Sequence, residues 1–148
     1  MLTNACKYTI RAVIYLALNS DANKKLGAKL IARELDVPQA FLAKLLLKLS
    51  TEQLITSAKG PGGGFFLSKA NLANTLWDII IAIDDEQKLN DCFLGLVKCN
   101  SDNPCPVHYI AAPFKEQLLN DFKKKTISTM AGEMIQNGTV ITLSGYKM

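Results

Sequence analysis

The chain has 148 residues, of which 49% are hydrophobic, and its formal net charge is +4 at pH 7. This length fits one domain, or a small domain with an oligomerisation appendage, and the apolar share excludes a disordered chain. The longest apolar run, Ala12 to Leu18, is too short to cross a bilayer, and no small-residue cleavage site follows it. We therefore expect a cytoplasmic protein that does not enter a membrane. In that compartment, four cysteines favour metal or redox chemistry over disulfides.

The charge is unevenly distributed along the chain. Residues 1–70 hold ten Lys and Arg against four acidic residues, a net charge of +6, whereas residues 71–148 carry −2. A basic half of this kind is typical of a polyanion-binding protein, because Lys and Arg displace condensed counterions from nucleic acid. An ordinary solvated basic surface gives the same count, so charge alone leaves both interpretations open.

The first half predicts a winged helix-turn-helix. Apolar residues recur at helical spacing over three segments, 7–19, 27–35 and 38–50. Pro38 is expected at the first position of the third helix. Two strands follow, 54–58 and 65–67, joined by the glycine-rich turn 59–64. Helices followed by a hairpin in this order predict a fold that is mainly α with a small β wing.

The second half predicts further helices around a loop. Residues 75–83 are apolar nearly all round and indicate a buried helix, whereas residues 87–106 indicate a loop. A long helix ending near Lys125 and a short one over 128–136 complete the chain. Pro113 falls inside the long helix, and because proline lacks an N–H we expect the helix to start afresh there.

The third helix has the composition of a recognition helix. In a helix-turn-helix, the first turns of the second helix meet base edges in the major groove. Here those turns carry Gln39, Ala40, Ala43 and Lys44, and Gln can pair with adenine and Lys with guanine. Lys48 lies one turn beyond Lys44 and is expected to meet a phosphate. An amphipathic helix with solvated lysines is the alternative, and the neighbouring hairpin favours DNA binding.

The turn Lys59-Gly60-Pro61-Gly62-Gly63-Gly64 predicts a wing tip. It lacks the Gly-Lys-Ser/Thr of a phosphate-binding loop, and it opens no helix as a dinucleotide fingerprint does. Glycines let the backbone approach another molecule closely, and a cation at Lys59 suits the negative potential of a minor groove. A turn with a structural role alone is not expected to need three consecutive glycines.

The cysteines predict a metal centre. Three of them follow the pattern Cys92-x6-Cys99-x5-Cys105, and His108 comes shortly after. Thiolates bind zinc, copper(I) and iron–sulfur clusters, but these spacings do not match the short knuckles of zinc sites. We favour an iron–sulfur cluster over thiol-only redox sensing, zinc, a disulfide or inert thiols. Cys6 stands apart and is expected to be a small buried hydrophobic residue.

The order of basic winged helix, KGPGGGFFLSK wing and C-x6-C-x5-C-x2-H resembles the IscR/NsrR/CymR/RirA superfamily of bacterial winged-helix regulators. This resemblance implies a DNA-binding domain over 1–70, and a cluster-binding loop with dimerisation helices over 71–148. It implies a homodimeric transcriptional regulator, a repressor, on a palindromic double-stranded operator. It implies neither an enzyme nor a small-molecule substrate.

The resemblance also implies the cluster ligands. Cluster-binding members use the three cysteines, here Cys92, Cys99 and Cys105, with a fourth ligand that varies. A histidine just after the third cysteine matches His108, whereas Lys7 stands where an acidic residue would be expected. This implies a 2Fe–2S cluster in preference to a 4Fe–4S cluster. The chain departs from the pattern in its first cysteine gap, six residues rather than five, and in Lys59, where relatives often have Arg.

The residues expected to contact DNA lie on the two helices of the helix-turn-helix, at the N-terminus or in the wing. They are Thr3, Lys29, Gln39, Ala40, Lys44, Lys48, Lys59, Gly60, Gly62 and Gly63. Two alternative functions stay open. One is a cluster-free regulator that responds to thiol oxidation or a protein partner, and the other is a small electron carrier. The electron carrier leaves the wing and the basic half without a role.

Overall fold

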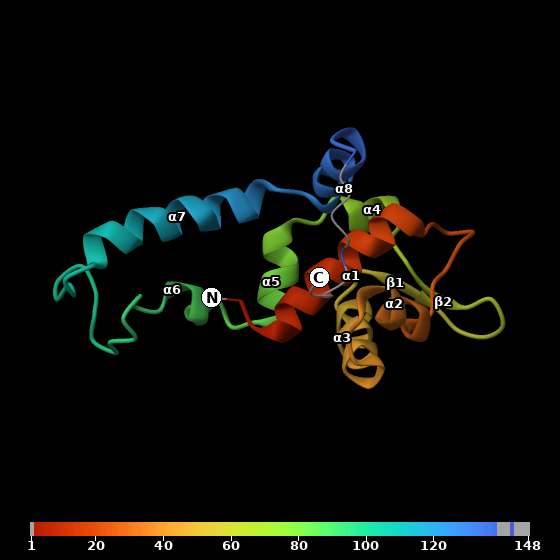
Figure 1. The fold of residues 1–148 in the computed structure, drawn as a ribbon, viewed down its shortest axis with the longest axis horizontal. Coiled ribbons are helices and arrows are strands. Elements are labelled where there is room, and N and C mark those ends of the chain that lie inside the picture. The colour runs from red at the N-terminus through yellow and green to blue at the C-terminus, as the bar shows by residue number, and fades with distance from the viewer. Residues whose placement is uncertain (1, 139–142, 144–148) are drawn as a thin grey trace.

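The chain forms a helical body that carries a hairpin on one side and a projecting helical arm on the other (Figure 1). The computed structural model describes residues 2–138 and residue 143, so the end of the 71–148 half lies outside the described residues. The elements, in chain order, are α1 (Asn4–Asn19), α2 (Ala28–Leu35), α3 (Gln39–Thr51), β1 (Thr56–Ala58), β2 (Gly64–Phe66), α4 (Lys69–Leu72), α5 (Leu76–Ile83), α6 (Glu86–Asn90), α7 (His108–Lys124) and α8 (Ile127–Gln136). Helices with a two-stranded antiparallel sheet confirm the predicted fold class.

The core of the body is formed by the inner faces of α1, α2 and α3. Their apolar residues recur every three or four positions, which places them on one side of each helix. The largest buried side chains of the three helices are Leu16, Ile31, Leu35, Leu42, Leu46 and Leu49, each at most 1% exposed. Burial of each contributes roughly 1.5–3 kcal/mol. Pro38 is the extended N-cap residue of α3, so the helix begins at Gln39, one residue later than expected.

The predicted wing is present, with a first strand that begins two residues later than expected and a second strand shifted by one residue toward the turn. Thr56 pairs with Phe66, and Ala58 pairs with Gly64. Leu26 forms a further bridge to Phe65, which ties the hairpin to the segment before α2. Leu67 lies in the core just after β2 ends at Phe66.

The glycines of the wing turn have internal structural roles. Gly60 and Gly62 adopt φ angles of +87° and +72°, in the left-handed region that favours glycine. A Cβ on Gly63 would lie 2.4 Å from the carbonyl oxygen of Ala58, and one on Gly64 would lie 2.8 Å from the backbone of Leu26. The expectation that a structural turn would not need three consecutive glycines is therefore wrong. The glycines of the wing do not by themselves indicate DNA binding.

Replacing Gly63 by alanine should lower the free energy of unfolding by about 1–3 kcal/mol, because the added Cβ overpacks the turn. Gly132→Ala is the matched control, since Gly132 lies in α8 with open space around it. Alanine there should raise the free energy of unfolding by about 0.5–1 kcal/mol. Chemical denaturation measures both, and a Gly63→Ala protein as stable as the wild type would contradict the observed turn.

Two short helices were not predicted. Ser68 and Asn71 form a reciprocal capping box that begins α4, and the Asn71 side chain also bonds to Thr56 and to the carbonyl of Gln53. Residues 86–90 form α6, although the loop was expected to begin at residue 87, because Asp85 caps this helix and Leu89 packs beside Trp77. Both helices depend on side-chain contacts that a periodicity argument does not detect.

The arm is α7, which extends away from the body without a break at Pro113 (Figure 1). The expected restart at this proline is wrong. The hydrogen bond that proline lacks would reach back to Tyr109, which is 69% exposed, so water can replace it. None of the described helices is long and apolar enough to span a bilayer.

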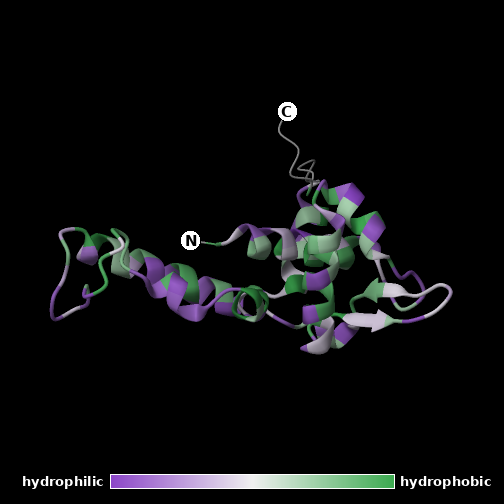
Figure 2. Ribbon diagram, turned by 90° about the horizontal axis from the view of Figure 1, so that it is seen from below, coloured by the Kyte–Doolittle hydropathy of each residue, from purple (hydrophilic) through white to green (hydrophobic). Residues whose placement is uncertain are grey.

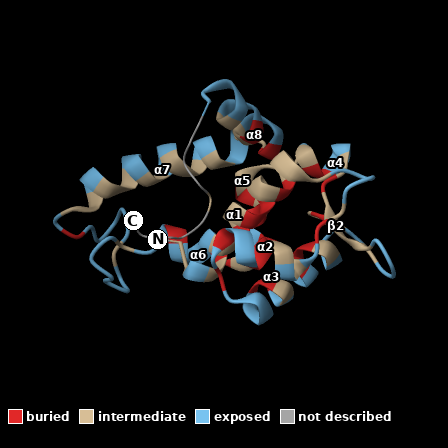
Figure 3. Cartoon of the chain, turned by 45° about the vertical axis from the view of Figure 1, so that its right-hand side comes forward, coloured by how far each residue is buried: buried red, intermediate tan, exposed pale blue. Residues whose placement is uncertain are grey.

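The C-terminal end of α7 is fixed to the body. The N–H of Leu76 donates to the carbonyl of Lys125 at 2.8 Å, and the N–H of Ile127 donates to the carbonyl of Asn74 at 2.9 Å. α8 then packs against α1, with Ile127 fully buried. The rest of α7 has no buried residue, as the tan and pale blue of Figure 3 show. The arm is thus anchored at one end, and no side chain along it is fully buried.

Candidate metal centre and nucleic-acid interface

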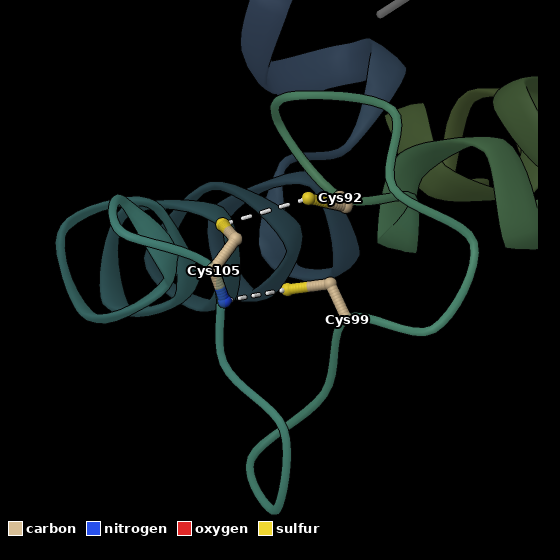
Figure 4. A group of neighbouring side chains, drawn as sticks. All are labelled: Cys92, Cys99 and Cys105. Carbon is tan, nitrogen blue, oxygen red and sulfur yellow. Dashed lines mark hydrogen bonds between the residues drawn. The ribbon is translucent and has the colours of Figure 1, made fainter.

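The three clustered cysteines converge at the free end of the arm. The sulfur atoms of Cys92, Cys99 and Cys105 all lie within 4.8 Å of one another, and the three thiols are free. The Cys92 and Cys105 sulfurs are 3.6 Å apart. The N–H of Cys105 donates to the sulfur of Cys99 at 3.3 Å. Figure 4 shows the three side chains pointing toward one another from separate parts of the loop, an arrangement that can hold a metal ion.

Tight turns in the loop bring the thiols together. The N–H of Gly95 donates to the carbonyl of Cys92 at 2.8 Å, and the N–H of Cys99 donates to the carbonyl of Leu96 at 3.2 Å. Asn100 and Asn103 then bond to each other's backbone and reverse the chain before Cys105. The loop length that does not fit a zinc knuckle is therefore taken up by successive turns.

His108 lies beside the thiols as the first residue of α7. Its Nδ1 is 3.4 Å from the sulfur of Cys99. Among the described residues, the set of ligand atoms that all lie close to one another contains only the three thiols. The structure thus places the predicted fourth ligand next to one cysteine, on the wall of the cavity that all three line.

The surroundings of the thiols shift the pKa values of two of them in opposite directions. Backbone hydrogen bonding from Leu96 is the main cause that lowers the pKa of Cys92, to about 7, with Leu94 and the neighbouring thiols helping and desolvation opposing. The backbone of Cys105 lowers the pKa of Cys99, but burial and the neighbouring thiols outweigh it and raise that pKa. A thiolate at Cys92 is the form that binds metals.

The thiols open onto a cavity of about 400 Å³ between the loop and α7. Its opposite wall consists of side chains from successive turns of α7, among them Ala112, Lys115, Glu116 and Leu119. A water molecule occupies about 30 Å³ in the liquid, so the space admits a group much larger than one ion. Soft donors converging on such a space fit an iron–sulfur cluster.

Lys115 connects this wall to the loop. Its ammonium group donates to the backbone carbonyl of Asp91, the residue before Cys92. The sequence did not single out Lys115, because nothing in its position along the helix predicts which loop residue it will meet. The contact couples the position of α7 to that of the first cysteine.

Cys6 lies outside the thiol group. It is fully buried with Trp77, Ile80 and Leu89, as expected for a small hydrophobic residue. Burial is the main cause that raises its pKa to about 12, and the nearby Asp84 carboxylate adds to the increase. This environment keeps the thiol protonated and disfavours metal binding.

The residues predicted to read DNA lie mostly on exposed surface. Those of α3, namely Gln39, Ala40, Lys44 and Lys48, are all exposed. Lys29 on α2 and the wing residues Lys59, Gly60 and Gly62 are exposed as well, whereas Gly63 is half-buried. Thr3 has another role, since it caps α1 and its hydroxyl donates to Asp84 at 2.5 Å. Contact with DNA stays a prediction for each of these residues.

Comparison with known proteins gives the family and the fold. The Rrf2 family, described as an iron-dependent transcriptional regulator, matches residues 2–133. A proposed HTH-type transcriptional regulator of Aquifex aeolicus is 38% identical over 132 residues, covering 88% of this chain and 90% of that protein. The HTH-type transcriptional regulator IscR of Escherichia coli is 27% identical over 144 residues, covering 97% and 85%.

Two solved structures share the fold at low sequence identity. CymR of Bacillus subtilis, a global cysteine regulator, aligns with a TM-score of 0.72 and 19% identity over 90% of this chain and 97% of that chain. IscR of T. potens aligns with a TM-score of 0.71 and 17% identity over 95% and 93%. Both likenesses concern the arrangement of the elements alone.

Proposed function

Since the chain belongs to the Rrf2 family of transcriptional regulators and is not an enzyme, we propose that it binds an operator under the control of an iron–sulfur cluster. The observation that carries the proposal is the convergence of three free thiols within 4.8 Å, in the same chain as a winged helix-turn-helix. We propose that it acts in the cytoplasm as a repressor, on palindromic double-stranded DNA.

Cys92, Cys99 and Cys105 would hold a 2Fe–2S cluster, with His108 as the fourth ligand. When bound, the cluster supplies a centre whose charge and ligation change with iron supply and oxidation. The turns of the loop hold the three thiols on one side of the cavity. His108 is held by the first turn of α7.

His108→Ala should leave a cluster that forms but is lost more rapidly in air, with a changed visible spectrum, because one ligand is missing. Glu116→Gln is the matched variant, since Glu116 lines the same cavity from α7 and offers a carboxylate oxygen in place of the imidazole nitrogen of His108. Anaerobic absorption spectra followed over time after exposure to air compare the two. A spectrum unchanged in His108→Ala and altered in Glu116→Gln would assign the fourth position to the carboxylate.

The exposed side of α7 supports a homodimer. Tyr109, Ile110 and Phe114 are 69%, 76% and 61% exposed. Ile110 and Phe114 are one turn apart, and they lie on the side of α7 opposite Ala112 and Leu119, which line the cavity. Figure 2 shows hydrophobic green beside hydrophilic purple along this helix. Uncovered aromatic and aliphatic side chains on a projecting helix are typical of an interface, and a second copy of this chain would cover them.

Packed helices connect the cysteine loop to the winged helix-turn-helix, which is called the reader domain below. Leu119 and Phe122 of α7 pack against Trp77 and Ile80 of α5, and α5 packs against α1. A second connection runs from Thr3 to Asp84, at the end of α5. Reordering of the loop would therefore move α7 relative to α5 and change the spacing of two reader domains. Such a switch needs a few kcal/mol of differential stability between the two states.

An anaerobic preparation tests the proposed cofactor. We expect a red-brown protein with visible absorption, and equal amounts of iron and sulfide on each chain. One observation favours a second candidate, because the 3.6 Å between the Cys92 and Cys105 sulfurs allows a disulfide. In that case an oxidant such as a peroxide would take two electrons and two protons from these thiols. A colourless, iron-free protein that still binds DNA, and that releases the DNA when it is oxidised, would contradict the cluster proposal and support this thiol switch.

A further inference from the structure

The outer face of α3 carries an uncovered leucine. Leu47 is 58% exposed, whereas Leu42, Leu46 and Leu49 of the same helix are fully buried and Leu45 is 9% exposed. We infer that Leu47 is a specificity-determining residue that contacts the 5-methyl group of a thymine in the major groove. This inference rests on the proposed DNA-binding function and adds a base-reading residue to it.

The position of Leu47 on the helix supports this role. With about 3.6 residues per turn, Lys44, Leu47, Lys48 and Thr51 lie on one side of α3, opposite the buried leucines. All four are exposed. Their spacing of i, i+3, i+4 and i+7 is the one by which homeodomain recognition helices contact the major groove. Leu47 therefore lies where a base-reading side chain is needed, on the turn after Lys44.

The fold gives Leu47 no other described role. The contacts of α3 with α1, α2 and α5 involve its buried face. In Figures 1 and 3, α3 lies at the opposite edge of the molecule from α7 and α8, so this helix is remote from the proposed dimer face. A leucine that serves neither the core nor that interface is available to a third partner.

The charges around Leu47 identify this partner as nucleic acid. Lys44 and Lys48 flank it, one turn before and one residue after, and both are exposed. Lysines on both sides suit a polyanion better than an apolar protein groove. In the major groove, the thymine methyl is the apolar group that each A·T pair presents, and apolar side chains contact it. Leu47 thus selects thymine at a base pair next to the one that Lys44 meets.

Deoxyuridine tests the inference at the level of one methyl group. Operators are first selected from random-sequence duplex DNA by the wild-type protein, with and without its cluster. Each thymine of the selected operator is then replaced by deoxyuridine. At one thymine in each half-site, wild-type affinity should fall about fourfold, because burying one methyl contributes about 0.8 kcal/mol and 1.4 kcal/mol is tenfold.

The Leu47→Ala variant should lose this sensitivity and bind the thymine and deoxyuridine operators within twofold of each other. Ile135→Ala is the matched control, since Ile135 is a similarly exposed aliphatic residue of α8, at 71%. It should keep the fourfold effect. Two results would contradict the role of Leu47 but not the proposed DNA binding. One is wild-type affinity that is the same with thymine and deoxyuridine at every position, and the other is a methyl effect that is unchanged in Leu47→Ala. Failure to select any operator contradicts the proposed DNA binding as well.

Discussion

Serine at Cys92, Cys99 or Cys105 should abolish the iron–sulfur cluster. Each variant is expected to be colourless after anaerobic purification, with iron and sulfide near background. The physical reason is that the three sulfurs converge within 4.8 Å on one cavity, so each would supply one of the few soft ligands there. A serine oxygen is a harder and more weakly binding donor than a thiolate. Visible absorption together with iron and sulfide counts measures the loss.

The fourth cysteine provides the control for this experiment. Cys6→Ala should keep the full visible spectrum, because Cys6 is buried beside Trp77 and Leu89, outside the thiol group. It should lose some stability, by about 1 kcal/mol, from the sulfur-sized gap left in a packed core. A Cys99→Ser protein with a complete cluster would contradict the proposed ligand set. Loss of the cluster in a folded Cys6→Ala protein would contradict it too.

Lys59→Ala should weaken operator binding by about tenfold for each bound subunit near 0.1 M salt, and reduce the salt slope by about one for each subunit. Lys59 is exposed at the entry to the wing turn, where a cation would meet backbone phosphates or the minor groove. The loss should be nearly the same on operator and on unrelated DNA, because a phosphate contact carries no sequence information. Titrations over a series of salt concentrations measure it.

Lys98→Ala removes the same charge from a different place. Lys98 is exposed in the cysteine loop, at the far end of the arm from the wing. Its removal should leave the salt slope within experimental error of the wild type. A slope equally reduced by both substitutions would mean that overall charge, rather than the wing, sets the salt dependence, and an unaltered slope in Lys59→Ala would exclude Lys59 from the interface.

The body of the protein follows from sequence patterns because its helices bury simple stripes. Leu42, Leu46 and Leu49 repeat every three or four residues and all are fully buried. The same reasoning missed α4 and α6, which depend on capping by Ser68 and Asp85 and span only four or five residues. It also overstated the effect of Pro113, since a lost bond in an exposed turn is replaced by water and does not break the helix.

The site could be predicted as a set of residue types but not as a geometry. Spacing identified the three cysteines and His108, and the structure brings them to one cavity. The Lys115 contact with Asp91 depends on how the loop returns to α7, which no local pattern encodes. Leu47 had a signal in the sequence, because it is an apolar residue outside the buried stripe of its helix. Only the structure shows that Leu47 is exposed and therefore available to contact a partner.

The most direct test of the central claim is an anaerobic titration of one operator with the cluster-loaded and the cluster-free protein, at the same salt concentration. The cysteine loop is bonded to α7 through Lys115 and Asp91, α7 packs against α5, and α5 packs against α1. We therefore predict affinities that differ by at least about tenfold, or 1.4 kcal/mol. Equal affinity in the two states, for a protein that binds the cluster and the operator, would contradict control of DNA binding by the cluster.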